Sequence, residues 1–249
     1  MRAPLALFAV LLAAGIAGRA EASPVTYRLS YLPAGEVASL GHGYENLTIH
    51  DPTARFSEAG AAGPLTLDVH SLTPGGGTTP LELLCTDVFD TYVSPGTYTL
   101  GRLSDTLHDA VKVGQIEALI QHGLPGVTDN ASASALQVAV WEVENETGDS
   151  GYSVTGGKFY VSGYAGALDP RMVSDASADL AKVLSGAWRS DPGKVVMQFE
   201  PFGRARNQSF AYIAPAPVPE PACVTLFGLG TLTAIWVGWR RRTGAVQTA

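Results

Sequence analysis

Two uncharged apolar segments, one at each end, most constrain what this chain can fold into. Residues 3–18 and 222–239 contain no Asp, Glu, Lys or Arg. Of the chain's 23 acidic residues, 22 lie within 23–221, and of its 16 basic residues, 11 do. The resulting net charge of −11 excludes an ordinary nucleic-acid binder, which needs clustered Lys and Arg. We therefore expect one acidic globular domain between two targeting segments.

The N-terminus has the features of a secretory signal. Arg2 precedes the apolar run, and small residues Ala20 and Ala22 occupy the two cleavage-site positions. This pattern predicts a signal peptide over 1–22 that is cut after Ala22. A short membrane anchor is the alternative, but the apolar run is brief for a span.

The C-terminus predicts a membrane span after a stiff linker. Proline recurs through residues 215–221, which favours an extended polyproline II conformation. Residues 222–239 have the length and apolarity of a transmembrane helix. The basic tail 240–249 begins with Arg240, Arg241 and Arg242, which should remain in the cytoplasm.

The linker, span and arginines together resemble the PEP-CTERM sorting signal of bacterial surface proteins. Its namesake motif matches Val218, Pro219, Glu220 and Pro221. The resemblance implies a membrane-anchored precursor that an exosortase-like enzyme cuts near the motif. It also implies release to the cell surface or extracellular matrix of a Gram-negative bacterium. A plain C-terminal anchor is the alternative, although it would not require the Pro-Glu-Pro.

The central part, 23–214, has the periodicity of an α+β domain. Alternating apolar and polar residues predict strands at 25–32, 44–50, 64–70, 81–89, 97–103, 194–200 and 208–213. Helical spacing predicts helices at 105–122, 130–145 and 170–188. Gly123 should end the first, Asp129 or Asn130 should cap the second, and Pro170 suits the first turn of the third. Strands on both sides of a helical insert predict an antiparallel β-rich, sandwich- or barrel-like domain.

Cysteine usage singles out one residue of this domain. Cys223 belongs to the predicted span, so Cys85 is the only cysteine of 23–214. Exported proteins normally pair their cysteines, and an odd thiol therefore indicates intermolecular pairing, a ligand role or special chemistry.

The surroundings of Cys85 resemble the Cys–Gln thioester domains of bacterial surface proteins. In those domains a strand cysteine meets a glutamine in a helical Thr-Gln-x-Ala-(Ile/Val)-Trp motif. Gln137, Ala139, Val140 and Trp141 match this motif in order, and Leu136 replaces the threonine.

Further segments fit the versions of this domain associated with PEP-CTERM proteins. Cys85 and Asp87 form the Cys-x-Asp segment, and Gly96 and Tyr98 form a Gly-x-Tyr strand. Residues 155–159 fit a Ser/Thr-Gly-Gly/Asn-x-Phe segment. The resemblance covers 83–159, about a third of the chain.

The resemblance implies a cross-link between Cys85 and Gln137. The thiolate attacks the carboxamide and expels ammonia, which requires near-attack contact, oxyanion donors and a dry site. Trp141, four residues after Gln137, would shield the bond, and Asp87 would support the site. The thioester would then acylate an amine on a surface protein or polysaccharide, giving covalent adhesion. No cofactor or metal is implied, and the protein is expected not to be an enzyme.

Three alternatives remain open. Cys85 could be a protease-like nucleophile with His108 or His122 as its base. A calcium site could form from Asp87, Asp90, Asp105 and Asp109, although their spacing is not that of a calcium loop. The third is a structural exopolysaccharide or biofilm-matrix protein with an inert cysteine. A missing ammonia in the intact mass would distinguish the thioester from this last reading.

Overall fold

The computed structural model describes residues 25–32, 43–146, 151–203 and 206–215. The predicted signal peptide, the Val218–Pro221 motif, the span 222–239 and the tail 240–249 lie outside the described residues. Within the described ranges, no helix combines the length and apolarity needed to cross a membrane.

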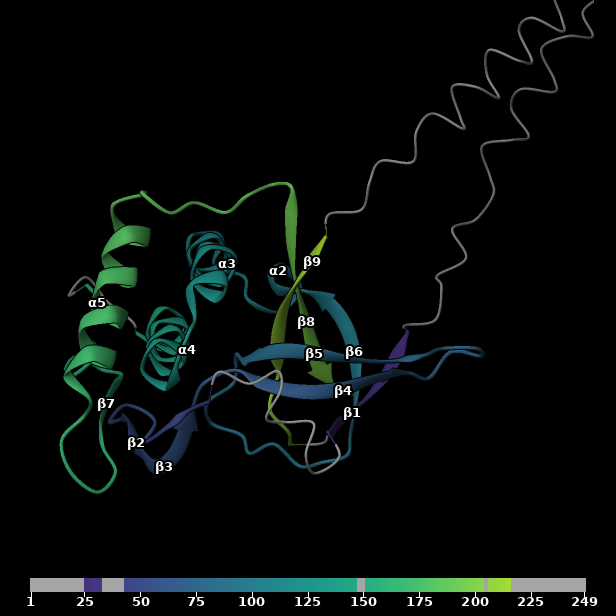
Figure 1. Ribbon diagram of the computed structural model, residues 1–249, viewed down its shortest axis with the longest axis horizontal. Coiled ribbons are helices and arrows are strands. Elements are labelled where there is room, and N and C mark those ends of the chain that lie inside the picture. The colour runs from purple at the N-terminus through teal and green to yellow at the C-terminus, as the bar shows by residue number, and fades with distance from the viewer. Residues whose placement is uncertain (1–24, 33–42, 147–150, 204–205, 216–249) are drawn as a thin grey trace, which may run out of the picture.

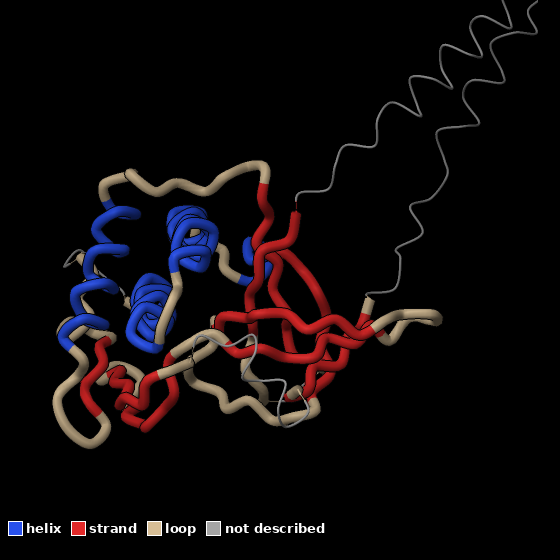
Figure 2. Tube along the Cα trace, viewed as in Figure 1, coloured by secondary structure: helices blue, strands red, loops and turns tan. Residues whose placement is uncertain are grey.

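The described chain contains nine strands in two antiparallel sheets (Figures 1 and 2). They are β1 (Thr26–Tyr31), β2 (Glu45–Asp51), β3 (Phe56–Ala62), β4 (Leu65–Ser71), β5 (Thr78–Cys85), β6 (Gly96–Arg102), β7 (Tyr160–Gly163), β8 (Lys194–Pro201) and β9 (Phe210–Pro215). Six of them close into a barrel in the order β1-β4-β5-β9-β8-β6, and the rest form a sheet β3-β2-β7. The predicted α+β class, an antiparallel β-rich domain with a helical insert, is confirmed.

The barrel is packed with side chains at its centre and opens at one end into a hollow of about 340 Å³, lined by residues of β1, β4, β5, β8 and β9. Alternate residues of its strands point inward, and Leu29, Leu67, Leu83 and Phe199 are almost wholly buried. A six-stranded barrel is narrow enough for side chains to fill its centre, and it closes between β5 and β9 through Leu84 and Cys85.

The three longer helices lie on one side of the barrel, above the smaller sheet in the view of Figure 1, and the short helix α2 lies against the barrel strands. The helical elements are α2 (Leu103–Thr106), α3 (Ala110–Gly123), the 3-10 turn η2 (Leu124–Gly126), α4 (Asn130–Asn145) and α5 (Pro170–Leu184). Helix α4 is central and contacts α3, α5, β2 and β3. Twelve of its sixteen residues are buried, which its alanines permit by letting neighbours approach closely.

The start of α4 is fixed by its own residues. The Asp129 side chain accepts a hydrogen bond from Ser132 N at 3.0 Å, and Ser132 Oγ accepts one from Asp129 N at 3.1 Å. This reciprocal capping box satisfies N–H groups that the helix leaves free. Arg171 on α5 also pairs with Asp129 at 2.6 Å. Of the two caps predicted from the sequence, Asp129 is the one used.

The predicted single helix over 105–122 is wrong. The chain forms α2 and α3 instead, with a break at Leu107–Asp109. Asp109 adopts an extended conformation and accepts hydrogen bonds from Val111 N and Lys112 N, so it starts a new helix. Gly123 is the last residue of α3, but it keeps a right-handed helical conformation and the chain continues into a 3-10 turn over Leu124–Gly126.

Other strand and helix boundaries differ from the predicted ones. Strand β5 covers Thr78–Cys85 rather than 81–89, and β3 and β7 were not predicted. Helix α5 ends at Leu184 rather than 188, because Gly186 takes a left-handed φ of 71° that ends a helix.

Candidate functional site

Cys85 lies where strand β5 leaves the barrel. On one side β5 pairs with β9, with Cys85 opposite Phe210. On the other side its pairing with β4 ends at Leu83, opposite Leu65. The next residue, Thr86, donates its N–H to Ser209 O at 2.9 Å, toward the β9 side. The backbone groups of Cys85 therefore point away from β9, toward a position that β4 does not occupy.

The side chain of Gln137 occupies that position. Cys85 N donates to Gln137 Oε1 at 3.0 Å, and Gln137 Nε2 donates to Cys85 O at 2.8 Å. The carboxamide thus replaces the peptide group of a missing strand neighbour. Gln137 is wholly buried, which makes both hydrogen bonds costly to lose. The structure brings together two residues that are 52 positions apart in the sequence.

The Cys85 sulfur lies in a dry environment. The residue is 5% exposed, and Sγ donates to Asp87 O at 3.0 Å. Burial raises the pKa of the thiol well above its usual value, and the charges of Glu144 and Asp87 raise it further. The hydrogen bond to Asp87 O and the nearby Trp141 lower the pKa, but burial dominates. Cys85 is therefore a neutral thiol in this state.

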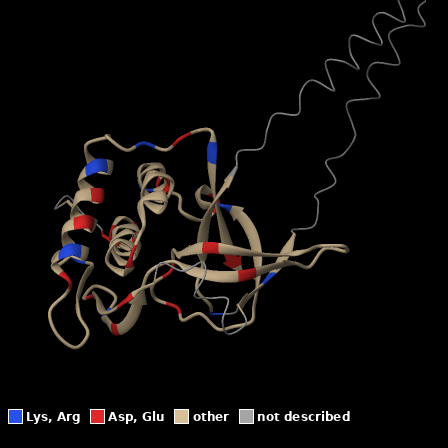
Figure 3. Cartoon of the chain, viewed as in Figure 1, with Lys and Arg blue, Asp and Glu red and all other residues tan. Residues whose placement is uncertain are grey.

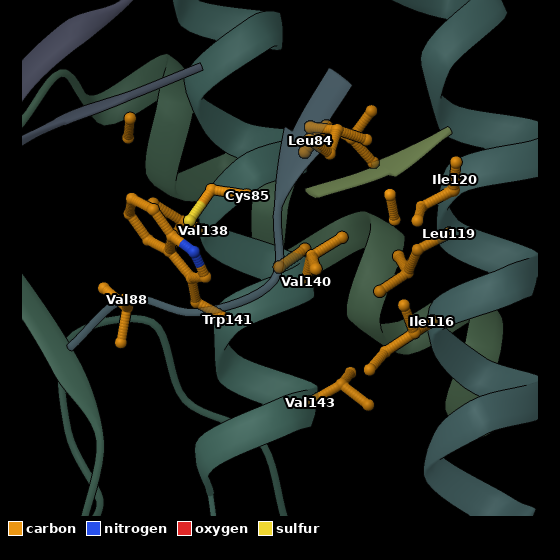
Figure 4. Close-up of a cluster of buried hydrophobic side chains, with 14 of the residues drawn as sticks. Leu84, Cys85, Val88, Ile116, Leu119, Ile120, Val138, Val140, Trp141 and Val143 are labelled. Atoms are coloured by element: carbon orange, nitrogen blue, oxygen red, sulfur yellow. The ribbon is translucent and has the colours of Figure 1, made fainter. Parts of the chain in front are cut away.

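Trp141 covers the sulfur. Figure 4 shows its indole beside Cys85 Sγ, with Val88 on the other side of the ring. The indole is 2% exposed, in keeping with the shielding role predicted for it. Its Nε1 has no hydrogen-bond partner that meets normal geometry, yet it is close enough to lower the pKa of the Cys85 thiol. A buried N–H without a partner is a donor that is ready for developing negative charge nearby.

The Gly-x-Tyr segment packs inside the barrel near the same cysteine. Tyr98 is wholly buried and packs against Phe210, the residue opposite Cys85. A Cβ on Gly96 would lie 2.6 Å from the Tyr98 ring, so glycine is required there. Burial raises the pKa of the Tyr98 phenol, with smaller contributions that include Cys85.

The segment 153–159, which includes 155–159, is held by carboxylates at the C-terminal end of helix α4 and on its C-cap residue. Glu146 Oε2 accepts hydrogen bonds from Lys158 N at 2.8 Å and Phe159 N at 3.2 Å. Glu142 Oε1 accepts one from Ser153 N at 2.6 Å. These contacts explain why this segment accompanies a glutamate-bearing helix: the carboxylates replace a strand partner for its backbone.

Leu136, where the resembled motif has threonine, faces away from Cys85. A Cβ placed on Gly123 of α3 would lie 2.6 Å from Leu136 Cδ1, so this side chain packs against the end of α3. The side chain at 136 therefore belongs to the contact between α3 and α4.

The histidines proposed as bases do not accompany the thiol. His108 and His122 are exposed, and His122 Nε2 contacts Arg189 O at 2.9 Å while its ring stacks on Trp188. Among the described residues, the charged groups that influence the pKa of Cys85 are Glu144 and Asp87.

The four aspartates of the possible calcium site have other roles or lie apart. Asp109 caps α3, Asp105 accepts from Arg102 N at 2.8 Å, and Asp87 accepts from Phe89 N at 3.1 Å. Across the described part of the chain, no group of three acidic, histidine or cysteine side chains is placed to hold a metal ion.

Glu144 is a site residue that the sequence analysis missed. It follows Gln137 by seven positions and Trp141 by three, so all three lie along one stripe of α4. Burial raises the pKa of Glu144 to about 8, Asp87 and Glu200 also raise it, and Lys112 lowers it. The i, i+4, i+7 spacing was the available signal, because it places a carboxylate on the face that carries the glutamine.

The geometry suits attack of the thiol on the carboxamide. Gln137 is immobilised against the backbone of the residue that carries the nucleophile, which removes most of the entropy cost of encounter. The Cys85 N–H already donates to Oε1, the atom that becomes the oxyanion when Sγ attacks the adjacent carbon. The Nε2 atom, which leaves as ammonia, is held by Cys85 O.

No family model matches the chain, and no curated protein sequence does. Solved structures with a similar architecture include the N-terminal domain of the Streptococcus pyogenes pilus tip adhesin Cpa, at 11% identity and a TM-score of 0.43. That match covers 70% of this chain and 95% of the adhesin domain. Another is the N-terminal thioester domain of a surface protein from Clostridium perfringens, at 13% identity and a TM-score of 0.42, covering 75% and 97% of the two chains. Identities and scores this low do not establish a shared chemistry.

Proposed function

We propose that this protein is an exported surface protein whose Cys85 and Gln137 form an intramolecular thioester for covalent adhesion. A single observation carries the proposal. The buried Gln137 carboxamide is held by hydrogen bonds of 3.0 and 2.8 Å to the backbone of Cys85 itself. The shield of Trp141 and the oxyanion donor at Cys85 N support it.

Thioester formation needs no external reagent. The Sγ–Cδ bond forms, the Cδ–Nε2 bond breaks, and the thiol proton leaves with the nitrogen as ammonia. A primary amine on a partner then attacks Cδ, giving an amide and returning Cys85 to the thiol. Each molecule reacts once and is consumed, so the protein acts as a stoichiometric cross-linker rather than an enzyme.

Intact mass spectrometry tests this proposal on protein purified from cells that express the full chain. The wild-type mass should be one ammonia below the mass calculated from the sequence between its observed termini. Treatment with methylamine should increase the measured mass by one methylamine. Cys85→Ala and Gln137→Ala should show neither effect.

Gln121→Ala is the matched control for this experiment. Gln121 is also a buried glutamine whose carboxamide bridges backbone groups, at Lys194 O and Asp191 N, but it lies on α3. This variant should keep the ammonia deficit. A wild-type chain of full mass, with Cys85 promptly alkylated by iodoacetamide in denaturant, would end the thioester proposal.

The second candidate is a structural exopolysaccharide or biofilm-matrix protein with an inert cysteine. Burial of Cys85 and the raised pKa of its thiol favour this function, since an unreactive cysteine behaves as a small apolar side chain. The same mass measurement decides between the two, because an inert cysteine leaves the full mass and takes up no methylamine.

For localisation, we propose PEP-CTERM sorting from a membrane-anchored precursor. The support is the sequence pattern of Val218–Pro221, the span 222–239 and Arg240–Arg242. An exosortase-like enzyme would cut near the motif, and the partner would be an amine-bearing surface protein or polysaccharide. Terminal peptide mapping of the extracellular form should end near Pro219–Pro221, and recovery of Thr248–Ala249 from that form would refute the sorting.

A further inference from the structure

A pocket with three carboxylates lies next to the Cys85–Gln137 pair. It has a volume of about 200 Å³ and includes Asp87, Glu144 and Glu200 in its lining. Phe89, Leu103 and Leu107 give it apolar walls. We call this hollow the acidic pocket. Its carboxylates come from the segment after β5, from α4 and from β8, so the fold assembles it from three separate parts of the chain.

No carboxylate of the acidic pocket forms an ion pair within the described ranges, although the charge of Lys112 lowers the pKa of Glu144. Asp87 accepts a backbone N–H from Phe89, and Glu200 accepts from Ser209 Oγ at 3.1 Å. Glu144 Oε2 is inaccessible to solvent and accepts no hydrogen bond.

The nearest lysine does not fill this gap. The Lys112 ammonium donates to the main-chain oxygens of Glu144 and Glu146, at 2.8 and 2.9 Å, rather than to a carboxylate of the pocket. Helix α4 carries Glu142 and Glu144 and no Lys or Arg, and Figure 3 shows acidic and basic residues along the whole fold. A buried carboxylate without a partner is costly, so this hollow favours a cation that brings its own hydrogen-bond donors.

The chemistry of the lining points to an organic ammonium. No acidic cluster in the described chain is arranged to ligate a metal. A primary ammonium on an aliphatic stem suits the lining better, because its methylenes can lie along Leu103 and Leu107 while its charge meets the carboxylates.

The acidic pocket is close to the reacting atoms. Asp87 lies two residues after Cys85, and its main-chain oxygen accepts a hydrogen bond from the Cys85 thiol. Glu144 is on the Gln137 stripe of α4, and helical side chains lean toward the N-terminus, here toward Trp141 and Gln137. The charges of Glu144 and Asp87 both act on the Cys85 thiol, and Thr86 lines the pocket, so the pocket begins one residue from the nucleophile.

We propose that the acidic pocket binds the primary ammonium group of the partner and that Glu144 accepts its proton before the amine attacks Gln137. This inference rests on the proposed thioester. In the first step R–NH₃⁺ gives a proton to the Glu144 carboxylate. The neutral nitrogen then bonds to Cδ, the C–S bond breaks, and a second nitrogen proton passes to Sγ to restore the thiol. Glu144 returns its proton to solvent.

The protonation energetics of Glu144 suit that role. An alkylammonium has a pKa of about 10.4. A glutamate with an ordinary pKa would be a poor acceptor for the ammonium proton. Burial raises the pKa of Glu144 to about 8, closer to that of the amine, and its carboxylate form, which accepts the proton, accumulates as the pH rises toward and above 8. Asp87 from the segment after β5, Glu200 from β8, Lys112 from α3 and Cys85 are the titratable groups facing it.

The test compares a cationic nucleophile with a neutral one on thioester-containing protein from the full chain. Nα-acetyl-lysine amide is an ammonium near neutral pH and needs a base, whereas hydroxylamine is neutral and does not. Glu144→Gln should slow opening by the lysine derivative at least about ten-fold and change opening by hydroxylamine less than about two-fold. The rate of opening by the lysine derivative should rise with pH in wild type partly because Glu144 ionises. In Glu144→Gln this part should be lost, and the remaining pH dependence should be that of the ionisation of the amine.

Glu142→Gln is the matched control, because Glu142 is a buried carboxyl of the same helix with its pKa also raised to about 8, and it lies outside the pocket lining. It should leave both rates near those of wild type. If Glu144→Gln slows both nucleophiles equally, or neither, the acidic pocket does not select the ammonium and the inference is wrong. If wild type shows no ammonia deficit, the proposed thioester itself is wrong. If wild type shows the deficit, the same deficit in Glu144→Gln demonstrates that the thioester still forms in the variant.

Discussion

The cross-link between Cys85 and Gln137 should appear as a coupling energy between two mutations. The contacts of Gln137 are with backbone atoms of Cys85, which Cys85→Ala retains. Without a thioester, the two single substitutions therefore act on largely separate interactions. With a thioester, each single substitution already removes the whole cross-link, and the double mutant cannot remove it again.

The structure sets the magnitudes. Once the thioester has formed, Nε2 has left as ammonia, so Gln137→Ala removes the acceptor of the buried Cys85 N–H, at about 1–3 kcal/mol, in addition to the cross-link. Cys85→Ala removes one small buried side chain and should cost less. By analogy with a disulfide, a cross-link closing the 52-residue separation contributes about 4 kcal/mol through the unfolded state. The double mutant should therefore be about 4 kcal/mol less destabilised than the sum of the single mutants.

Urea unfolding of wild type, both single mutants and the double mutant gives this coupling energy. Intact mass before and after each titration shows that the thioester survives in wild type. The control cycle pairs Cys85→Ala with Gln121→Ala, which should be additive within about 0.5 kcal/mol. A coupling below about 1 kcal/mol between positions 85 and 137, with the control additive, would refute the cross-link.

Two further predictions concern the support of the site. Gly157→Ala should destabilise the protein by about 1–3 kcal/mol in thermal unfolding, because φ is 103° there and a Cβ would overlap Glu146 Oε2. Gly126→Ala, where a Cβ meets no atom, should not, and equal losses in both would contradict the argument. The free energy of unfolding should fall as pH rises from about 4.5 to 8, because the pKa of Glu142 is raised to about 8 by burial, so the folded state binds its proton more tightly. Glu142→Gln should reduce the decrease of the free energy of unfolding with pH. If this decrease is unchanged in the variant, it comes from other carboxyls such as Glu144 and not from Glu142.

Local sequence patterns predicted most elements but not their limits. Strands at 25–32, 44–50, 64–70 and 97–103 were found because alternation reflects one buried face. Strand β3, Phe56–Ala62, was missed because its alanines and glycine carry little strand preference, and its pairing with β2 holds it in place. Pro80 hid the start of β5, but its strand has no β9 neighbour at that position and loses no ladder hydrogen bond there.

For the candidate site, too, the sequence predicted one part and the tertiary structure supplied another. The pairing of Cys85 with Gln137 was expected from motif resemblance rather than from periodicity. The structure adds that the carboxamide completes the hydrogen bonding of Cys85 where strand β4 has not yet begun. That arrangement depends on the barrel register, which non-local pairing sets.

The sequence by itself determined the acidic character of the domain, its antiparallel α+β class, and the identity of an unpaired Cys85 and a motif glutamine. The acidic character, the fold class and the unpaired cysteine follow from composition and from spacing along a single strand or helix, and the glutamine follows from the motif resemblance. Only the tertiary structure decided that the barrel closes, that Trp141 covers the sulfur, and that Asp87, Glu144 and Glu200 share one pocket. Contacts of this kind join residues far apart in the chain, and their energies exist only after packing excludes water and brings the elements together.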